Sequence, residues 1–236
     1  MPKPSLSKKD IAAINRLLEE YESQQSKIVT FGNQLVTALT DSEPLAKHIH
    51  SIRLRIKDPH HLRRKLQRKV LEAKAKKRLF RITPGTLLTR ITDLVGIRIL
   101  HLYTRQIHEI DPILRSVLAE QKYSIREGPF ARTWDDESRS FFQSCGIRTQ
   151  RSPSMYTSVH YVVGSASRTL VTCELQVRTL MEEVWGEVDH SMNYPIPSEV
   201  LACREQLRVL ARVTSSATRL VDAIFLTLDE AEADKP

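Results

Sequence analysis

The spacing of apolar positions divides the chain into two helical ends and a mixed middle. In residues 7–40 the apolar side chains recur every three or four residues, as on one face of a helix: Ile11, Ile14, Leu17, Leu18 and Tyr21. Ser7 and Asp10, ahead of this stripe, have the spacing of a capping box. Residues 198–232, rich in Leu, Val and Ala, predict a second long helical region.

Between these ends, segments with strand and helix patterns alternate. That order predicts an α+β (mixed α/β) fold, with a mixed β-sheet core and helices flanking it at both ends of the chain. We expect one compact unit in three regions: an N-terminal helical region (1–44), a core (45–195) and a C-terminal helical region (196–236).

Residues 51–57 predict a half-buried strand with a cationic face. Apolar and basic side chains alternate along it: Ile52, Leu54 and Ile56 on one face, Arg53, Arg55 and Lys57 on the other. Asp58 and Pro59 then have the residue types of a helix N-cap and first turn.

The helix that follows carries four cations in its first turns: Arg64, Lys65, Arg68 and Lys69. Because residues three and four apart share a helix face, Arg64 or Lys65 can join Arg68 toward one ligand. A strand end and a helix start that both offer cations predict a cradle for a polyphosphate. A solvated basic helix explains the same charges about equally well.

Leu94 to Leu102 predicts a buried strand, with Asp93 at its entry and Arg98 inside it. Asp93 is either a turn residue or, beside a phosphate cradle, a ligand of Mg²⁺. Simple alternation places Asp93 and Arg98 on opposite faces of the strand, unless a bulge near Gly96 shifts the pattern.

Two later segments, 156–163 and 169–178, predict an antiparallel hairpin in which Ser158 lies opposite Glu174. In this register Tyr156 faces Gln176, and His160 faces Thr172. One face of the hairpin is then polar: Tyr156, Ser158, His160, Thr172, Glu174, Gln176 and Arg178. The other face is mainly apolar: Val159, Tyr161, Val163, Val171, Cys173, Leu175 and Val177.

A polar face this dense predicts a binding site, although one wet face is also common in antiparallel sheets. Thr179 and Glu182, at the end of the hairpin, have the spacing of a second capping box. They predict a helix whose core-facing side chains are Val184, Trp185 and Val188.

The composition of the chain indicates an anionic ligand. The net charge is +8 and the pI about 9.5, which favours nucleotide phosphates or RNA as ligands. No apolar run is long enough to span a membrane, and the start of the chain has no signal-type apolar segment, so we expect a cytoplasmic protein. The three cysteines lack C-x-x-C spacing, which favours reduced thiols.

Four short motifs carry a resemblance to a known family: "RIK" ahead of the basic helix, "DLVGIRI", "YTSVHYVV", and "ELQVRT" followed by "WGEVDH". In this order and spacing they resemble the RelA/SpoT-type alarmone synthetase domain, over roughly residues 45–195. The resemblance implies a nucleotidyltransferase-like core that moves the β,γ-pyrophosphate of ATP to the ribose 3′-hydroxyl of GDP or GTP, using Mg²⁺. Paired H-D and E-D hydrolase motifs are absent from the sequence, so the chain resembles a small, synthetase-only member.

The resemblance also implies roles for individual residues. Arg55 and Arg98 would sandwich the adenine of ATP, and Lys57, Lys65 and Arg68 would hold its phosphates. Asp93 and Glu174 would be the catalytic carboxylates and metal ligands, with Glu174 taking the proton of the 3′-hydroxyl. Tyr156 would stack on the acceptor base, and His160, Gln176 and Arg178 would line the acceptor site.

Two departures from the family pattern fall on the acceptor side. The family run K-x-x-G-Y is "SPSMY" here, with Ser152 and Met155 in place of lysine and glycine, and Arg151 is a candidate source of the charge. Glu183 stands where the family has an asparagine. The donor is therefore a firmer prediction than the acceptor.

Two alternatives follow from these departures. Toxin-type relatives resemble this domain but pyrophosphorylate the 3′ end of tRNA, and the basic run at 74–81 suits an RNA backbone. Such a protein would have an antitoxin partner. The other alternative is a basic RNA-binding module without catalysis, against which the two carboxylates and the donor-side cations count. Small synthetases of this family also lead us to expect a homo-oligomer.

Overall fold

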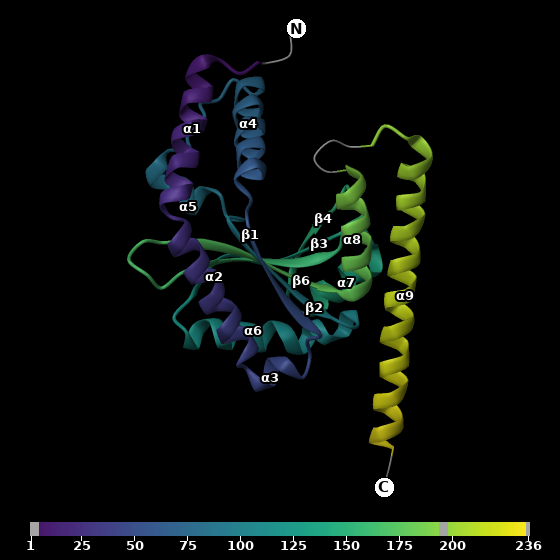
Figure 1. Ribbon diagram of the computed structural model, residues 1–236. Helices are drawn as coiled ribbons and strands as arrows, with labels where there is room; N and C mark the ends of the chain where they lie inside the picture. The colour runs from purple at the N-terminus through teal and green to yellow at the C-terminus, as the bar shows by residue number, and fades with distance from the viewer. Residues whose placement is uncertain (1–4, 194–197, 235–236) are drawn as a thin grey trace.

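The computed structural model describes residues 5–193 and 198–234, and within them one mixed six-stranded sheet of order β1-β2-β6-β5-β3-β4 (Figure 1). Its strands are β1 (Ser51–Ile56), β2 (Val95–His101), β3 (Ser124–Thr133), β4 (Arg148–Arg151), β5 (Ser158–Gly164) and β6 (Thr172–Thr179). Pairing is antiparallel except between β2 and β6 and between β3 and β4, which run parallel. The predicted α+β fold is confirmed.

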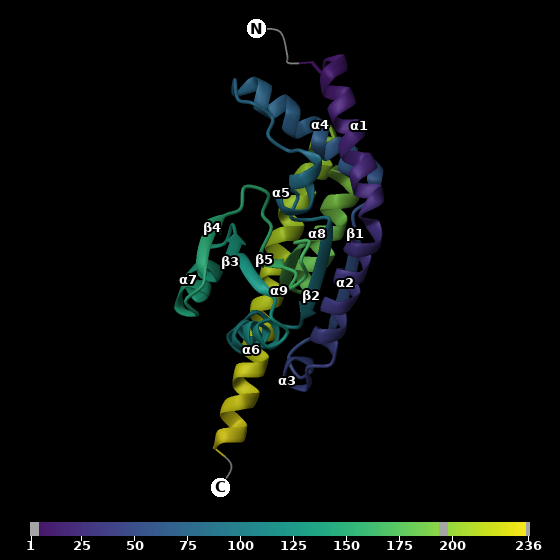
Figure 2. The same ribbon diagram turned by 90° about the vertical axis from the view of Figure 1, so that its left-hand side faces the viewer.

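Helices cover both faces of this sheet. They are α1 (Lys8–Ser23), α2 (Gln25–Thr40), α3 (Glu43–Ala46), α4 (Pro59–Ala75), α5 (Leu87–Arg90), α6 (Ile107–Glu120), α7 (Asp136–Ser144), α8 (Leu180–Asn193) and α9 (Leu201–Ala233). Figure 1 shows α8 and α9 side by side on one side of the sheet, with α1 and α2 on the other. In the turned view of Figure 2, α7 lies beside β3 and β4, at the sheet edge far from α2. None of the helices in the described ranges is long and apolar enough to cross a membrane.

The apolar face of the sheet packs against α2 and α6. Gly32 of α2 lies so close to β1 that a Cβ there would be 3.0 Å from Leu54 Cδ1. The Tyr161 hydroxyl of β5 donates a hydrogen bond to Asp111 Oδ1 of α6, at 2.5 Å. This packing leaves the opposite face, with its alternating charges, toward α8.

The N-terminal prediction is confirmed in its main points. Ser7 and Asp10 form the predicted capping box, with the Ser7 N–H 2.7 Å from Asp10 Oδ2. The helical region breaks at Gln24 into α1 and α2. Of the predicted apolar stripe, Ile14, Leu17, Leu18 and Tyr21 are buried, whereas Ile11 is 45% exposed. At this level α1 faces the charged last turn of α4, where the Lys74 ammonium reaches Asp10 Oδ2 at 2.5 Å.

The hairpin of β5 and β6 has its predicted faces but not its predicted register. His160 lies opposite Gln176, four residues beyond the predicted Thr172, and Val162 lies opposite Glu174. The connection is longer than expected because residues 165–171 form their own turn, closed by the Ser165 N–H bonding to Val171 O at 2.9 Å. A shift of four residues is even, so each side chain keeps its face.

Helix α8 differs from its prediction because it covers the charged face of the sheet. Val184 and Val188 are 53% and 37% exposed, so their predicted burial is wrong, whereas Trp185 is buried. The capping box is half formed: the Glu182 N–H bonds to Thr179 Oγ1 at 3.2 Å, but the Glu182 carboxylate accepts from the Thr157 N–H instead. The inward side of α8 is thus polar, with Glu182 and Glu183 buried.

Burial of Glu182 predicts a pH-dependent stability. Burial raises the pKa of Glu182 from 4.5 to about 7, despite the opposing effects of the Thr157 N–H and Arg178. Because the folded state favours the protonated form, this group stabilises the fold below about pH 4.5, and its contribution is lost as the pH rises to about 7.

We expect Glu182→Gln to be more stable than the parent chain at pH 8, by an amount on the order of 3 kcal/mol, and about equal to it near pH 4.5. Urea unfolding of both chains across this pH range measures the difference between their free energies of unfolding. The titrations of all other groups are common to the two chains and cancel in this difference. A difference that does not change with pH would contradict the buried-acid assignment.

Candidate functional site

Strand pairing brings the predicted polar residues of four separate segments onto one face of the sheet. Arg53 and Arg55 of β1 lie opposite Arg98 and Gly96 of β2. Gly96 and Arg98 in turn pair with Glu174 and Gln176 of β6, and Gln176 pairs with His160 of β5. The predicted donor-side and acceptor-side residues therefore share one surface, although 121 positions separate Arg55 from Gln176 in the sequence.

Asp93 lies between two lysines from different elements. Its Oδ2 is 2.7 Å from the Lys57 ammonium, at the end of β1, and its Oδ1 is 2.7 Å from the Lys65 ammonium, in α4. Asp58 caps α4 by accepting the His60 N–H at 2.8 Å, and so fixes the helix start beside the strand end. Burial alone would raise the pKa of Asp93, but the charges of Lys65 and Lys57 hold it below its ordinary value. Asp93 is therefore an anion at neutral pH.

The expected conflict between Asp93 and Arg98 does not arise. Asp93 lies in a turn before Val95, where β2 begins, so strand alternation does not govern its direction. The pairing of β2 with β1 and β6 is continuous through Gly96, and no bulge is needed.

Glu174 is held by a neutral histidine. His160 Nδ1 lies 3.2 Å from Glu174 Oε1. Burial lowers the pKa of His160, so the neutral ring donates from Nδ1, while its buried Nε2 has no hydrogen-bond partner among the described residues. Burial would raise the pKa of Glu174, but the hydrogen bond from His160 and nearby positive charge, including Lys65, together hold that pKa below its ordinary value. Glu174 is therefore an ionised acceptor on a fixed support.

Phe130 and Arg132 of β3 complete this part of the face and were not predicted. The Phe130 ring stacks on His160, with ring centroids 5.6 Å apart and an interplanar angle of 5°, and the Arg132 guanidinium lies 5.4 Å from the Phe130 centroid. The alternation of Phe130 and Arg132 was the signal available in the sequence, but Gly128 and Pro129 interrupt the strand pattern just before them.

Glu183 of α8 gathers three arginines of the sheet face. Its Oε1 is 2.9 Å from Arg98 Nη1 and 3.4 Å from Arg53 Nη1, and its Oε2 pairs with the buried Arg178. Arg98 also pairs with Glu187, one turn further along α8. The residue that departs from the family pattern thus organises the cations around it.

Tyr156 stands over the C-terminal half of β6, beside a cavity of about 290 Å³. Its hydroxyl donates to Gln176 Oε1 at 3.2 Å, so the predicted proximity of these two side chains holds, although Tyr156 precedes β5. Met155, where the family has glycine, adopts a φ of 57°, in the left-handed region that glycine enters without strain. The backbone geometry that the family's glycine would permit is thus kept here at a steric cost.

Two predicted donor residues sit at the margin of the site. Arg55 Nη2 lies 3.2 Å from His61 Nδ1, at the start of α4. Arg68 is largely exposed, with its Nε 3.5 Å from Glu72 on the same helix. Both guanidinium groups are therefore paired on the exposed side of this strand–helix unit and not with Asp93 or Glu174.

The residues present fit a hard divalent cation. Asp93 and Glu174 offer ionised carboxylate oxygens, the ligand type that Mg²⁺ prefers. The described residues contain no cluster of three or more His, Cys, Asp or Glu that would form an all-protein cage. This donor set suits an ion that takes its remaining ligands from phosphates and water.

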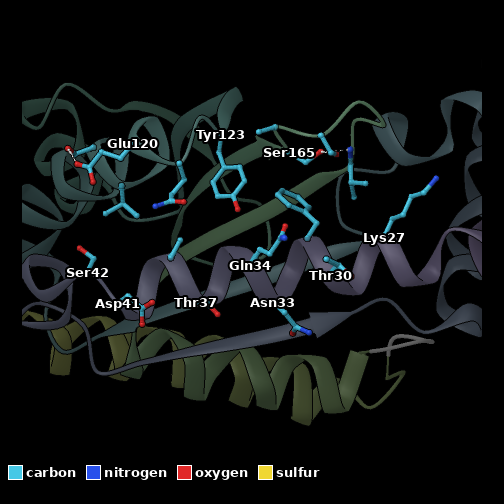
Figure 3. Close-up of a pocket in the computed structure, with 18 of the residues that line it drawn as sticks. Lys27, Thr30, Asn33, Gln34, Thr37, Asp41, Ser42, Glu120, Tyr123 and Ser165 are labelled. Atoms are coloured by element: carbon cyan, nitrogen blue, oxygen red, sulfur yellow. Dashed lines mark hydrogen bonds between the residues drawn. The ribbon is translucent and has the colours of Figure 1, made fainter.

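A larger groove, of about 1510 Å³, lies away from this face, between α2, α6 and the turn at 165–171 (Figure 3). Hydroxyl and amide side chains such as Thr30, Gln34 and Ser165 dominate its lining. Its few charges are of both signs, with Lys27 near one end and Asp41 near the other. Without a cluster of cations among its described lining residues, it does not suit a polyphosphate, and the charged face remains the candidate site.

Known proteins resemble this chain in sequence family and in fold. A family profile described as "Region found in RelA / SpoT proteins" matches residues 54–199, more than half of the 236 residues. A search of curated protein sequences finds no match.

Among solved structures, small alarmone synthetase 1 from Bacillus subtilis bound to AMPCPP is similar, with a TM-score of 0.60 at 18% identity, over 90% of this chain and 99% of that one. The same enzyme bound to its product pppGpp gives a TM-score of 0.51 at 20% identity, over 94% and 97% of the two chains. A GTP pyrophosphokinase family protein from Streptococcus pneumoniae gives 0.54 at 18%, over 98% and 100%. These likenesses extend the shared fold to the helices outside the family match, and the match itself shows that the chain belongs to the RelA/SpoT family.

Proposed function

We propose that this chain transfers the β,γ-pyrophosphate of ATP to the 3′-hydroxyl of GDP or GTP. The observation that carries the proposal is that two ionised carboxylates lie close enough for the charge of Asp93 to act on Glu174, with Asp93 between Lys57 and Lys65 and Glu174 on His160. Family membership and the similar B. subtilis enzyme, bound in separate structures to AMPCPP and to pppGpp, support it.

In the proposed reaction the acceptor 3′-oxygen attacks the β-phosphorus of ATP. The bond from the β-phosphorus to the oxygen that bridges it to the α-phosphorus breaks, and AMP leaves with that oxygen. Glu174 accepts the hydroxyl proton through a carboxylate that His160 keeps oriented. Because little covalent chemistry falls to the protein, positioning and charge neutralisation do most of the catalysis.

Donor recognition falls to the cations around Asp93. Lys57 and Lys65 lie where they can exchange part of their contact with Asp93 for the phosphates of ATP. Arg55 and Arg98 flank the same face from β1 and β2, and planar guanidinium groups stack well on a base. Mg²⁺, held by Asp93 and Glu174, would neutralise charge on the transferred phosphates.

Acceptor recognition falls to the cavity beside Tyr156. Its ring offers a stacking surface for the acceptor base, and Gln176 and His160 lie along the path from that surface to Glu174. In this proposal ATP binds at the cations around Asp93, the acceptor binds beside Tyr156, and the two carboxylates lie between the two nucleotides.

The test is incubation of the chain with Mg²⁺, γ-labelled ATP and, separately, GDP, GTP and bulk tRNA. Label in a guanosine tetra- or pentaphosphate supports the proposal. Label in tRNA supports the toxin-type alternative, for which the exposed cations after α4, such as Lys77 and Arg78, would contact the RNA backbone. Absence of label from every acceptor supports the non-catalytic module.

Lys65→Ala should weaken ATP binding by roughly 1.5–3 kcal/mol, the value of a charge-assisted contact, whatever the acceptor is. Lys65 is assigned to the donor phosphates, so the acceptor affinity should stay unchanged. Isothermal titration calorimetry with a non-hydrolysable ATP analogue measures the change in binding free energy. Lys76→Ala, at the C-cap of the same helix and roughly 16 Å further along its axis, is the matched control. Equal affinities for both variants would mean that this strand–helix unit serves another ligand.

A further inference from the structure

The Arg178 side chain is enclosed between α8 and Tyr156. Arg178 is only 4% exposed, although it belongs to the polar row of β6. On its α8 side, a Cβ built on Gly186 would lie 2.7 Å from Arg178 Nη1 and 3.4 Å from its Cζ. The same guanidinium lies 5.4 Å from the centroid of the Tyr156 ring. The absence of a side chain at Gly186 therefore leaves the space that the guanidinium fills.

The charge of Arg178 is already paired within the protein, although its buried Nε has no hydrogen-bond partner among the described residues. Its Nη2 pairs with Glu183 Oε2, and the Glu183 carboxylate is itself buried. A guanidinium that is buried, paired and covered by an aromatic ring is poorly placed to attract a phosphate from solvent. It is well placed to support the ring, because a cation near an aromatic ring attracts it and both groups here are largely removed from water.

The strand ladder does not fix Tyr156, although its backbone N–H donates to Ser152 Oγ at 3.2 Å. The preceding Met155 holds a left-handed φ of 57°, and Tyr156 lies outside β5, whose ladder begins at Ser158. The ring is fixed mainly by its surroundings. Its hydroxyl bonds to Gln176, and the ring contacts His160 and Trp185 at centroid distances of 5.8 and 6.4 Å, in addition to Arg178.

We propose that Arg178 is a positioning residue that sets the Tyr156 ring for stacking on the acceptor base, and that Gly186 is required because any larger side chain displaces Arg178. This inference rests on the proposed function. In it Arg178 affects binding of the acceptor base indirectly, by holding Tyr156, and does not bind the acceptor phosphates.

Gly186→Ala and Arg178→Lys test it, with Gly85→Ala as the matched control, since a Cβ at Gly85 meets no atom within 4 Å. Both test variants should raise the acceptor KM about tenfold, within the range of a lost base stack, with the ATP KM and kcat near the parent values. Their Kd values for GMP, GDP and GTP, measured by titration without ATP, should rise by the same factor, because the base is common to all three. A loss that grows with the number of phosphates would overturn the proposal and make Arg178 a phosphate ligand.

A double-mutant cycle separates positioning from general damage to the fold. In a Tyr156→Ala background, Gly186→Ala should cause no further rise in acceptor KM, because the ring that it displaces is gone. Additive losses would overturn the inference. If the parent chain makes alarmone and Gly186→Ala leaves the acceptor KM unchanged, this inference is wrong but the proposed function stands. A parent chain that makes no product from any guanine nucleotide sinks the proposed function, and the inference falls with it.

Discussion

Glu174→Gln should lower the rate of pyrophosphate transfer by about 10²–10⁴-fold while leaving both nucleotides bound, because an amide keeps the shape of the carboxylate but cannot accept the hydroxyl proton. The loss should be larger if Glu174 also holds the metal. The substitution spares the local structure, since the glutamine oxygen can still accept the hydrogen bond from His160 Nδ1. Single-turnover rates at saturating ATP and acceptor measure the chemical step directly.

The matched contrast is Tyr156→Ala, which removes the base-stacking surface and leaves the carboxylate in place. It should mainly weaken acceptor binding, by roughly 1–3 kcal/mol, with a smaller effect on the single-turnover rate at saturation. The two variants lie on adjacent parts of one face, so their different effects distinguish the two roles. If Glu174→Gln changed only acceptor affinity and Tyr156→Ala only the chemical step, the assignment of the two residues would be wrong.

Alternating sequence patterns were enough to predict the face that carries these residues. In β1 and in the hairpin of β5 and β6, polar and apolar side chains alternate with a period of two, so the pattern specifies which residues share a face. The pattern does not distinguish between registers that differ by an even number of residues, because each of them puts the same side chains on the same face. The turn at 165–171 sets the register, through hydrogen bonds that the sequence does not reveal.

The sequence could not predict the layer above this face. In the sequence, Glu183 stood out only as a departure from a family pattern. Its role in pairing with the arginines depends on where α8 crosses the sheet. That crossing places its carboxylate within reach of Arg53, Arg98 and Arg178, which are far from it in sequence or on another element. The exposure of Val184 has the same origin, since a helix that covers a charged surface turns its carboxylates inward.

Phe130 and Arg132 illustrate a third limit. They reach the site because β3 pairs with β5, placing Phe130 opposite His160 and Arg132 opposite Ser158. Irregular pairing around Gly128 precedes them, and an irregular strand gives a weak periodic signal. A long-range pairing of this kind follows from the completed sheet and not from any local window.

Asp93→Asn should abolish transfer, lowering the rate by at least about a thousandfold, because it removes a carboxylate from the place where charge must be neutralised. The unfolding temperature should fall only modestly, since asparagine keeps the shape of the side chain and the turn but loses the charge attraction to Lys57 and Lys65. Asp10→Asn is the matched control: Asp10 is also paired with a lysine, Lys74, but lies in the capping box of α1, outside the site.

Binding measurements then separate the two roles that Asp93 can have. If Asp93 holds the metal, the Asp93→Asn chain should bind ATP in EDTA no more weakly than the parent chain, because Lys57 and Lys65 lose a competing anion and remain available to the phosphates. Adding Mg²⁺ should tighten ATP binding in the parent chain but not in the variant. If ATP binding collapses in EDTA instead, Asp93 acts by aligning the two lysines. Normal turnover in the variant would remove both roles and leave Asp93 a turn residue.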